Sequence, residues 1–245
     1  MSESPVRFLV IGAGRGGTSL LAGLLDFHSC LEVGFELFSM ATIGGKEMPP
    51  GADTKIFDDR LTAFLRHCGD EALRYPGKIW GNKITTEHIG CLEEHNEANP
   101  GEEIEVLDRL FNDALRSQKI VFILRDGRGC VRSKVNRTGQ SMRGACRRWR
   151  YSARCYQFLR DRHQNNIRVR FEDLLRSPEP TLRSVCDFLE IPFEPSMLNG
   201  TSNQKMLPEY QQGGIDPARA AVAELPAEYL DLIRDDLVDC GYTVD

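Results

Sequence analysis

Apolar residues along this chain fall into short runs separated by stretches of helical periodicity, a pattern typical of alternating strands and helices. The strongest run covers residues 119–124, where five consecutive apolar residues suit a strand that is covered on both faces. Residues 8–11 form a second run, and a helix is expected from Thr18, where leucines recur at helical spacing. Further strands are predicted at residues 30–38, 78–83 and 167–171.

Amphipathic periodicity predicts the helices between and after these strands. The segments so predicted begin at Thr18, Asp58, Asn99, Arg143, Ser177 and Pro226. Asp58 would cap its helix, and Gly241 would end the last one. The helix over residues 143–160 is strongly basic, with Trp149 and Tyr156 expected on its inward face.

Alternating strands and helices predict an α/β fold of three layers, with a mainly parallel sheet and helices on both faces. We expect one domain over the whole chain, because no repeat or low-complexity linker divides it. Residues 39–56 and 192–217 lack clear periodicity, and long loops of this kind often cover a substrate. Ligands of such sheets bind beyond the carboxyl ends of the strands, so the segments after Ile11, Trp80 and Leu124 are expected to meet there.

Composition indicates a soluble globular protein. Of the 245 residues, 41% are hydrophobic and 27% are charged. No apolar run approaches the ~18 residues of a membrane span, and the first residues lack the basic and apolar regions of a signal peptide. We therefore expect a cytoplasmic protein that does not engage a membrane. The sequence leaves its state of association open, a homodimer included.

Charge and cysteine usage exclude several classes of function. The net charge of −5 gives no reason to expect nucleic-acid binding. Eight scattered cysteines form no Cys-x-x-Cys pair and no Cys/His cluster, so buried free thiols are expected and no metal is indicated. The charge is uneven, however, because residues 125–170 contain thirteen arginines and one lysine against two acids. This segment predicts a cationic surface within an acidic protein.

A glycine-rich turn follows the first predicted strand and opens the first helix, which makes it a candidate anion site. Glycines let backbone N–H groups close around a phosphate, and a helix N-terminus adds about half a positive charge. Gly12-x-Gly14-x-x-Gly17 fits the dinucleotide-binding fingerprint. Glu32 or Glu36 then lies ~20 residues further along the sequence, where this fingerprint has the acidic residue that binds a ribose.

Other interpretations of the same turn stay open. Gly12-x-x-x-x-Gly17 also begins a P-loop, but Thr18 stands where that motif has lysine. Alternatively, Arg15-Gly-Gly-Thr-Ser19 is the functional unit, with one cation, two glycines and two hydroxyls for a terminal phosphate. A tight turn that binds nothing is the remaining alternative.

A second candidate anion site follows the strongest predicted strand. Arg125 stands at the end of this strand, and Ser133 lies about two helical turns further on. A guanidinium and a hydroxyl suit one phosphate dianion, whereas an ordinary ion pair of Arg125 with Asp126 is the structural alternative.

Taken together, the two sites resemble those of the sulfotransferases that use 3′-phosphoadenosine-5′-phosphosulfate (PAPS). Arg15-Gly-Gly-Thr-Ser-Leu-Leu is similar to the family's Arg-Ser-Gly-Thr-Thr-Leu loop, and the segment from Arg125 through Ser133 to Arg137 is similar to its 3′-phosphate segment. Other pieces resemble the tyrosylprotein sulfotransferase branch or the family's stretch beside the adenine: Leu25-Asp-Phe-His28, Gly34-Phe-Glu36, Gly81-Asn-Lys83 and Arg170-Phe-Glu-Asp-Leu174.

The resemblance implies a role for each matching residue. The 5′-phosphate would be held by Arg15, Gly16, Gly17, Thr18 and Ser19, and the 3′-phosphate by Arg125, Ser133 and Arg137. Phe171, which replaces the family's tyrosine, would stack on the adenine, and Ser202 and Lys205 would stand in for the family's cap. Glu36 would be the catalytic base, Lys83 would assist sulfuryl transfer, and Arg15 would stabilise the leaving phosphate.

The activity so implied is in-line transfer of a sulfuryl group from PAPS to a hydroxyl, less readily an amine, of a small-molecule or peptide acceptor. We expect no membrane anchor, in contrast to the tyrosylprotein enzymes. Two other functions remain as alternatives. An NAD(P)-dependent oxidoreductase would use the glycine turn with Glu36, and a non-catalytic module would bind nucleotides or polyanions through the arginine-rich segment.

Overall fold

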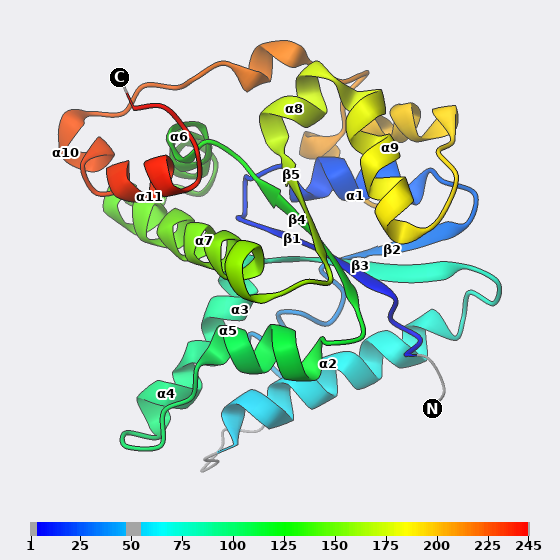
Figure 1. Ribbon diagram of the computed structural model, residues 1–245, viewed down its shortest axis with the longest axis horizontal. Coiled ribbons are helices and arrows are strands. Elements are labelled where there is room, and N and C mark those ends of the chain that lie inside the picture. Colours follow the sequence, from blue (N-terminus) through cyan, green and yellow to red (C-terminus); the bar gives the residue numbers. More distant parts are fainter. Residues whose placement is uncertain (1–3, 48–54, 245) are drawn as a thin grey trace.

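The computed structural model describes residues 4–47 and 55–244, and its centre is a five-stranded sheet in which every pairing is parallel. The strand order is β2-β3-β1-β4-β5 (Figure 1). The strands are β1 Phe8–Gly12, β2 Leu31–Phe35, β3 Ile79–Thr85, β4 Lys119–Leu124 and β5 Asn166–Arg170.

Helices connect these strands and continue to the C-terminal end. The longer ones are α1 Thr18–Asp26, α2 Ile56–Ala72, α6 Gly127–Thr138, α7 Met142–Arg162 and α9 Pro178–Leu189. The shorter ones are α3 Thr86–Gly90, α4 Glu94–Ala98, α5 Val106–Asp108, α8 Phe171–Arg176, α10 Ala227–Leu230 and α11 Arg234–Asp239. Short 3₁₀-helical segments and one π-helical segment (η2) complete the chain: η1 Cys91–Glu93, η2 Arg109–Ala114, η3 Pro195–Ser202, η4 Pro208–Tyr210 and η5 Pro217–Ala220.

The sheet separates two hydrophobic cores, because successive residues of a strand point to opposite faces. Within β1, Leu9 and Ile11 join one core and Phe8 and Val10 join the other. Helices α2 and α7 pack on the first face, and α1, α8 and α9 pack on the second (Figure 1). This arrangement confirms the expected three-layer α/β fold.

Several predicted elements differ from the structure at their ends. The helix expected from Asn99 begins instead at Val106, because Asn99 ends α4 by donating a hydrogen bond to the His95 carbonyl (2.7 Å). The predicted helix over residues 226–239 is divided into α10 and α11. Asp58 lies in the first turn of α2, which Lys55 precedes, and does not cap it.

Two other expectations concern extended segments. The second strand ends at Phe35, short of the predicted residue 38. Part of the predicted loop over residues 39–56 lies outside the described residues, and its described beginning forms consecutive turns up to residue 47. None of the helices within residues 4–47 and 55–244 has the length and apolar character that a bilayer crossing requires.

Candidate active site

A cavity of about 820 Å³ opens at the carboxyl ends of β1 and β3, within the size range of small-molecule sites. Its wall combines the turn after β1, Glu36 after β2, the end of β3 with α3, the N-terminal part of α7 and residues 209–219. Five residues predicted to take part in the chemistry or in holding the 5′-phosphate are in this wall together with Gly17: Arg15, Thr18, Ser19, Glu36 and Lys83.

The glycine turn after β1 has a left-handed backbone at two positions. Arg15 has φ 73° and Gly17, directly before α1, has φ 100°. A side chain at Gly17 would place its Cβ 2.3 Å from Cδ2 of Phe171, so only glycine fits there. The Gly16 N–H is used inside the turn, where it donates to the Ala13 carbonyl (2.8 Å).

The two candidate anion sites meet at Arg15. Its Nε donates to Oγ of Ser133 (3.2 Å), and its carbonyl accepts from Nη1 of Arg125 (3.2 Å). Burial lowers the pKa of Arg125, and the charge of Arg15 acts in the same direction. Two cations and a hydroxyl therefore lie next to each other, with no carboxylate of the described residues ion-paired to Arg15 or Arg125. Such a cluster can accept a polyanion.

Glu36 follows the last residue of β2, and the strand register places it beside Lys83. Phe35 is paired with Lys83 in the sheet, and the Glu36 N–H donates to the Lys83 carbonyl (2.8 Å). The side chains meet as well, because Lys83 Nζ lies 2.5 Å from Oε1 of Glu36. The lysine side chain is 5% exposed and the glutamate 39%, so Glu36 faces the cavity.

A buried asparagine holds the turn that carries Glu36. Asn82 donates from Nδ2 to the Leu37 carbonyl (2.9 Å), next to a turn in which Glu36 and Phe38 both have positive φ. Ser39 adds a hydrogen bond from its hydroxyl to the Glu36 carbonyl (2.8 Å). Backbone strain of this kind is common at functional sites and persists only where neighbours hold it.

His88 is a site residue that the sequence did not indicate. Its Nδ1 accepts a hydrogen bond from the Thr85 N–H (3.1 Å), which leaves the proton of the neutral ring on Nε2. Nε2 lies 3.9 Å from Oε2 of Glu36. Burial lowers the pKa of His88 despite the opposing charge of Glu36, so the ring is neutral at pH 7.

A buried ion pair between Glu87 and Lys134 was also not predicted. Glu87 accepts the Gly14 N–H (2.9 Å) and pairs with the ammonium of Lys134, so it ties α3 and α6 to the glycine turn. Burial by itself would raise the pKa of Glu87, but Lys134 and the Gly14 N–H outweigh it and lower this pKa. The signal was absent from the sequence because 73 residues separate Gly14 from Glu87.

Of the predicted cofactor residues around Arg15, five lie outside the cavity wall: Gly16, Arg125, Ser133, Arg137 and Phe171. Arg137 is exposed, pairs with Glu209 (3.4 Å) and lies over the Tyr210 ring. Phe171 is 0% exposed, with the guanidinium carbon of Arg125 4.6 Å from its ring centroid. Adenine could stack on Phe171 only if the covering arginine moved.

The structure does not support Ser202 and Lys205 as the cap. Lys205 pairs with Asp26 (2.7 Å) and Glu32 (2.5 Å), at the C-terminal end of α1, and Ser202 donates to the Asn199 carbonyl. A nine-residue helix is about 13 Å long, so this lysine lies far from the turn that precedes α1. Tyr210 occupies the covering position instead, with its ring 4.7 Å from the Arg15 guanidinium carbon.

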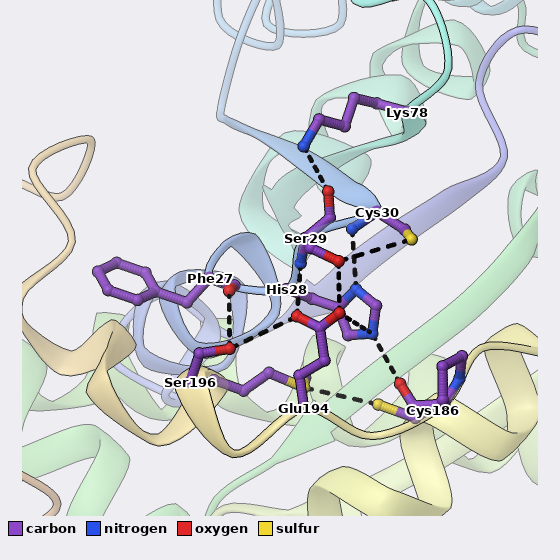
Figure 2. Close-up of polar contacts among 10 residues, drawn as sticks. Phe27, His28, Ser29, Cys30, Lys78, Cys186, Glu194 and Ser196 are labelled. Atoms are coloured by element: carbon purple, nitrogen blue, oxygen red, sulfur yellow. Dashed lines mark hydrogen bonds and ion pairs between the residues drawn. The ribbon is translucent and has the colours of Figure 1, made fainter.

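His28 has a structural role after the end of α1. Its Nε2 contacts the Pro192 carbonyl (2.7 Å), and Nδ1 accepts the Cys30 N–H (3.0 Å). Glu194 accepts hydrogen bonds from the N–H and hydroxyl of Ser29, so the end of α1 is joined to the segment after α9 (Figure 2).

Comparison with known proteins identifies the family. The sequence matches the family model described as "Sulfotransferase family" over residues 7–195. The structure is similar to the sulfotransferase domain from the curacin biosynthetic pathway, with a TM-score of 0.66 and 18% identity over 100% of both chains. For the sulfotransferase domain of the Synechococcus PCC 7002 olefin synthase, the TM-score is 0.63 and the identity 20%, over 100% of this chain and 98% of that one.

A third similar structure is mouse sulfotransferase SULT7A1 complexed with PAP, with a TM-score of 0.52 and 10% identity over 98% of this chain and 87% of that one. At such identities the structural likeness shows the fold alone. Curated proteins give no sequence match, and none of these comparisons singles out the tyrosylprotein branch. Because the family model covers most of the sequence, the chain belongs to the sulfotransferase family.

Proposed function

We propose that the protein transfers a sulfuryl group from PAPS to the hydroxyl of a small-molecule or peptide acceptor, with Glu36 as the general base. The observation that carries this proposal is the meeting of Glu36, Lys83 and the Arg15 turn around one cavity. A carboxylate, an ammonium and an anion-binding turn are the groups that sulfuryl transfer needs. The complex of the mouse sulfotransferase with PAP agrees with the proposed donor.

The donor would lie across the two anion sites. Arg15 and the backbone of Gly17, with the hydroxyls of Thr18 and Ser19, would hold the 5′-phosphate at the N-terminus of α1. The 3′-phosphate would bind Arg125 and Ser133, with Arg137 beside them. The contacts of Arg15 with Ser133 and Arg125 support this placement, because they bring the two anion sites together.

The reaction would be an in-line displacement at sulfur, in which positioning and charge stabilisation provide most of the rate. The acceptor oxygen forms the new S–O bond while the bond from sulfur to the 5′-phosphate oxygen breaks. The hydroxyl proton passes to the Glu36 carboxylate. The released bisphosphate carries the electron pair of the broken bond, and Arg15 and Lys83 stabilise its charge.

The sheet order argues against the oxidoreductase alternative. In the dinucleotide-binding fold, the glycine turn and the acidic ribose ligand follow neighbouring strands. Here β3 lies between β1 and β2, so Glu36 and the glycine turn are not on adjacent strands. Glu36 instead pairs with Lys83 of the intervening strand.

Ligand-induced stabilisation tests the donor. Adenosine 3′,5′-bisphosphate at about 100 times its Kd should add about 2.7 kcal/mol, or raise the Tm by about 5–11 °C for a chain of this size. NAD and ATP at equal concentration should give smaller shifts. A shift with NAD and none with the bisphosphate would reject the proposal.

The base is tested by Glu36→Gln, which keeps a hydrogen bond to Lys83 but cannot take a proton. Turnover should fall about 10²- to 10⁴-fold, and the Kd of the bisphosphate, measured by calorimetry, should be unchanged. Lys78→Gln is the control, since Lys78 is a solvent-exposed lysine outside the cavity wall that bonds the Ser29 carbonyl. Full turnover by the Glu36 variant would show that another group is the base.

A further inference from the structure

The charges around the cavity do not cancel. Five carboxylates line it, and four of them have an ion-pair partner. The pairs are Glu36–Lys83, Glu87–Lys134, Glu94–Arg60 and Glu209–Arg137. The fifth carboxylate, Glu97, has no ion pair within the part of the chain that the structure describes.

The arginines of the same wall differ from these carboxylates in their ion pairing. Four arginines line the cavity: Arg15, Arg147, Arg148 and Arg219. None of them is ion-paired to a carboxylate of residues 4–47 or 55–244, whereas Arg60, Arg109 and Arg154 each pair with a carboxylate. The cavity therefore holds an excess of uncompensated positive charge.

Two of the four arginines belong to the proposed donor site. Arg15 contacts Ser133, and the guanidinium carbons of Arg219 and Arg125 lie 5.8 and 4.6 Å from the centroid of the Phe171 ring. Burial lowers the pKa of Arg219, and the charges of Arg125 and Arg15 lower it further, so these three cations are close together. The phosphates of the donor would neutralise this group.

Arg147 and Arg148 lie elsewhere in the cavity, on the face of α7 that packs against α3 and η1. Gly144 and Tyr151 share this face, and the Tyr151 hydroxyl donates to Glu93 of η1 (3.0 Å). Burial raises the pKa of the thiol of Cys91, the residue that follows α3, and the nearby positive charge of Arg148 opposes this rise. α3 begins at the end of β3 and carries His88, whose Nε2 lies 3.9 Å from Oε2 of Glu36, so the helix against which α7 packs also reaches Glu36.

We propose that Arg147 and Arg148 bind an anionic group of the acceptor, a carboxylate or a phosphate, while the hydroxyl of the acceptor faces Glu36. This inference rests on the proposed function. The donor would leave these two arginines without a counter-charge, and Glu97 is the one carboxylate of the wall that has no ion pair among the described residues. Planar guanidinium groups suit carboxylate and phosphate oxygens, which they bind with two parallel hydrogen bonds. The acceptor class is thus a hydroxyl compound with an acidic end.

The test uses the full chain saturated with adenosine 3′,5′-bisphosphate, so that the donor site is filled. Benzoate, phenyl phosphate and benzyl alcohol are titrated by calorimetry at constant ionic strength. The variants are Arg147→Ala/Arg148→Ala and the charge-matched control Arg132→Ala/Arg143→Ala. Both control residues are exposed arginines of α6 and α7 outside the cavity wall.

At least one of benzoate and phenyl phosphate should bind the wild type about tenfold or more tightly than benzyl alcohol, since one charge-assisted hydrogen bond contributes enough for this ratio. The Arg147/Arg148 variant should lose the preference, the control should keep it, and both should bind the bisphosphate as the wild type does. The ratio of the two anions shows which acidic group fits. The inference is overturned if neither anion is preferred, or if the Arg147/Arg148 variant keeps the preference.

Failure of the proposed function has a different signature. If the wild type does not bind the bisphosphate, the donor assignment falls, and the same titrations on the unliganded protein still decide the anion preference. Loss of the preference in the Arg147/Arg148 variant then supports the arginine site alone, and its retention overturns it.

Discussion

At Glu36, a backbone conformation decides where the carboxylate points. The resemblance predicted both Glu36 and Lys83, through the segments Gly34-Phe-Glu36 and Gly81-Asn-Lys83. It could not predict the left-handed turn after β2 (φ 59° at Glu36) or Asn82 beneath it, since these depend on contacts between separate strands. His88 was missed for the same reason, because only folding brings it to Glu36.

The Glu87–Lys134 pair allows a prediction about stability. Glu87→Gln should lower the free energy of unfolding at pH 7 by about 3–5 kcal/mol, because it leaves the Lys134 ammonium (side chain 4% exposed) buried without a counter-charge. The folded state lowers the pKa of Glu87, so the pair contributes fully above the ordinary glutamate pKa. Its contribution is lost as the pH falls through the lowered value. Urea unfolding at pH 7 and in acid should therefore show a difference that shrinks in acid.

The control for this prediction removes both charges. Glu87→Gln/Lys134→Met should be more stable than Glu87→Gln alone, because no uncompensated charge stays buried. Equal stability of Glu87→Gln and the wild type at pH 7 would contradict the role given to the pair.

At the scale of elements, the strands were easier to predict than the helix ends. The central strand β4 was predicted at its observed bounds, because a strand buried on both faces is apolar at every position. Pro100 indicated a helix start, yet the side chain of Asn96 binds both the N–H and the carbonyl of Ile104 (2.9 Å each) and holds the intervening segment as a loop. Such a pair of hydrogen bonds between a side chain and the backbone leaves no periodic pattern in the sequence.

The turn before α1 gives a prediction for one element. Gly17→Ala and Gly77→Ala both place alanine at positive φ (100° and 84°), which costs about 1–2 kcal/mol. The new Cβ at position 77 would meet open space, whereas at position 17 it would overlap the Phe171 ring. Overpacking adds about 1–3 kcal/mol, so urea unfolding should show the larger loss for Gly17→Ala.

Nucleotide binding separates the two variants further. Only Gly17→Ala should weaken binding of the bisphosphate, because Gly77 lies in the turn before β3, at the opposite edge of the sheet from the cavity. Equal losses of stability and of affinity in the two variants would show that the contact with Phe171 does not constrain the turn.

At the scale of the whole molecule, burial in the two cores determines the reactivity of the cysteines. All eight are free thiols, and burial raises the pKa of several of them, to about 12 for Cys68 and about 11 for Cys130. Cys30, next to Ser29 after the end of α1 (Figure 2), is exposed. Cys91 is half-buried. The thiolate is the reactive form, so exposure and pKa together set the rate of alkylation.

Alkylation of the native protein with iodoacetamide at pH 8 should therefore modify Cys30 first and Cys91 more slowly. The remaining six thiols should react only after unfolding, as counted by mass spectrometry. Cys30→Ser should remove the fast phase and leave the others unchanged. Rapid modification of several thiols in the native protein would contradict the packing of both cores.

The order of the strands has a consequence for how such a protein could diversify. The groups assigned to the donor follow β1, β4 and β5, together with Lys83 of β3, whereas the groups assigned to the acceptor are Glu36 after β2 and Arg147 and Arg148 of α7. Glu87 of α3 binds both the glycine turn and Lys134 of α6, so α3 belongs with the donor groups although it follows β3. A protein engineer who wanted a new acceptor would accordingly change Arg147 and Arg148 of α7 and leave Glu36, Lys83 and α3 untouched.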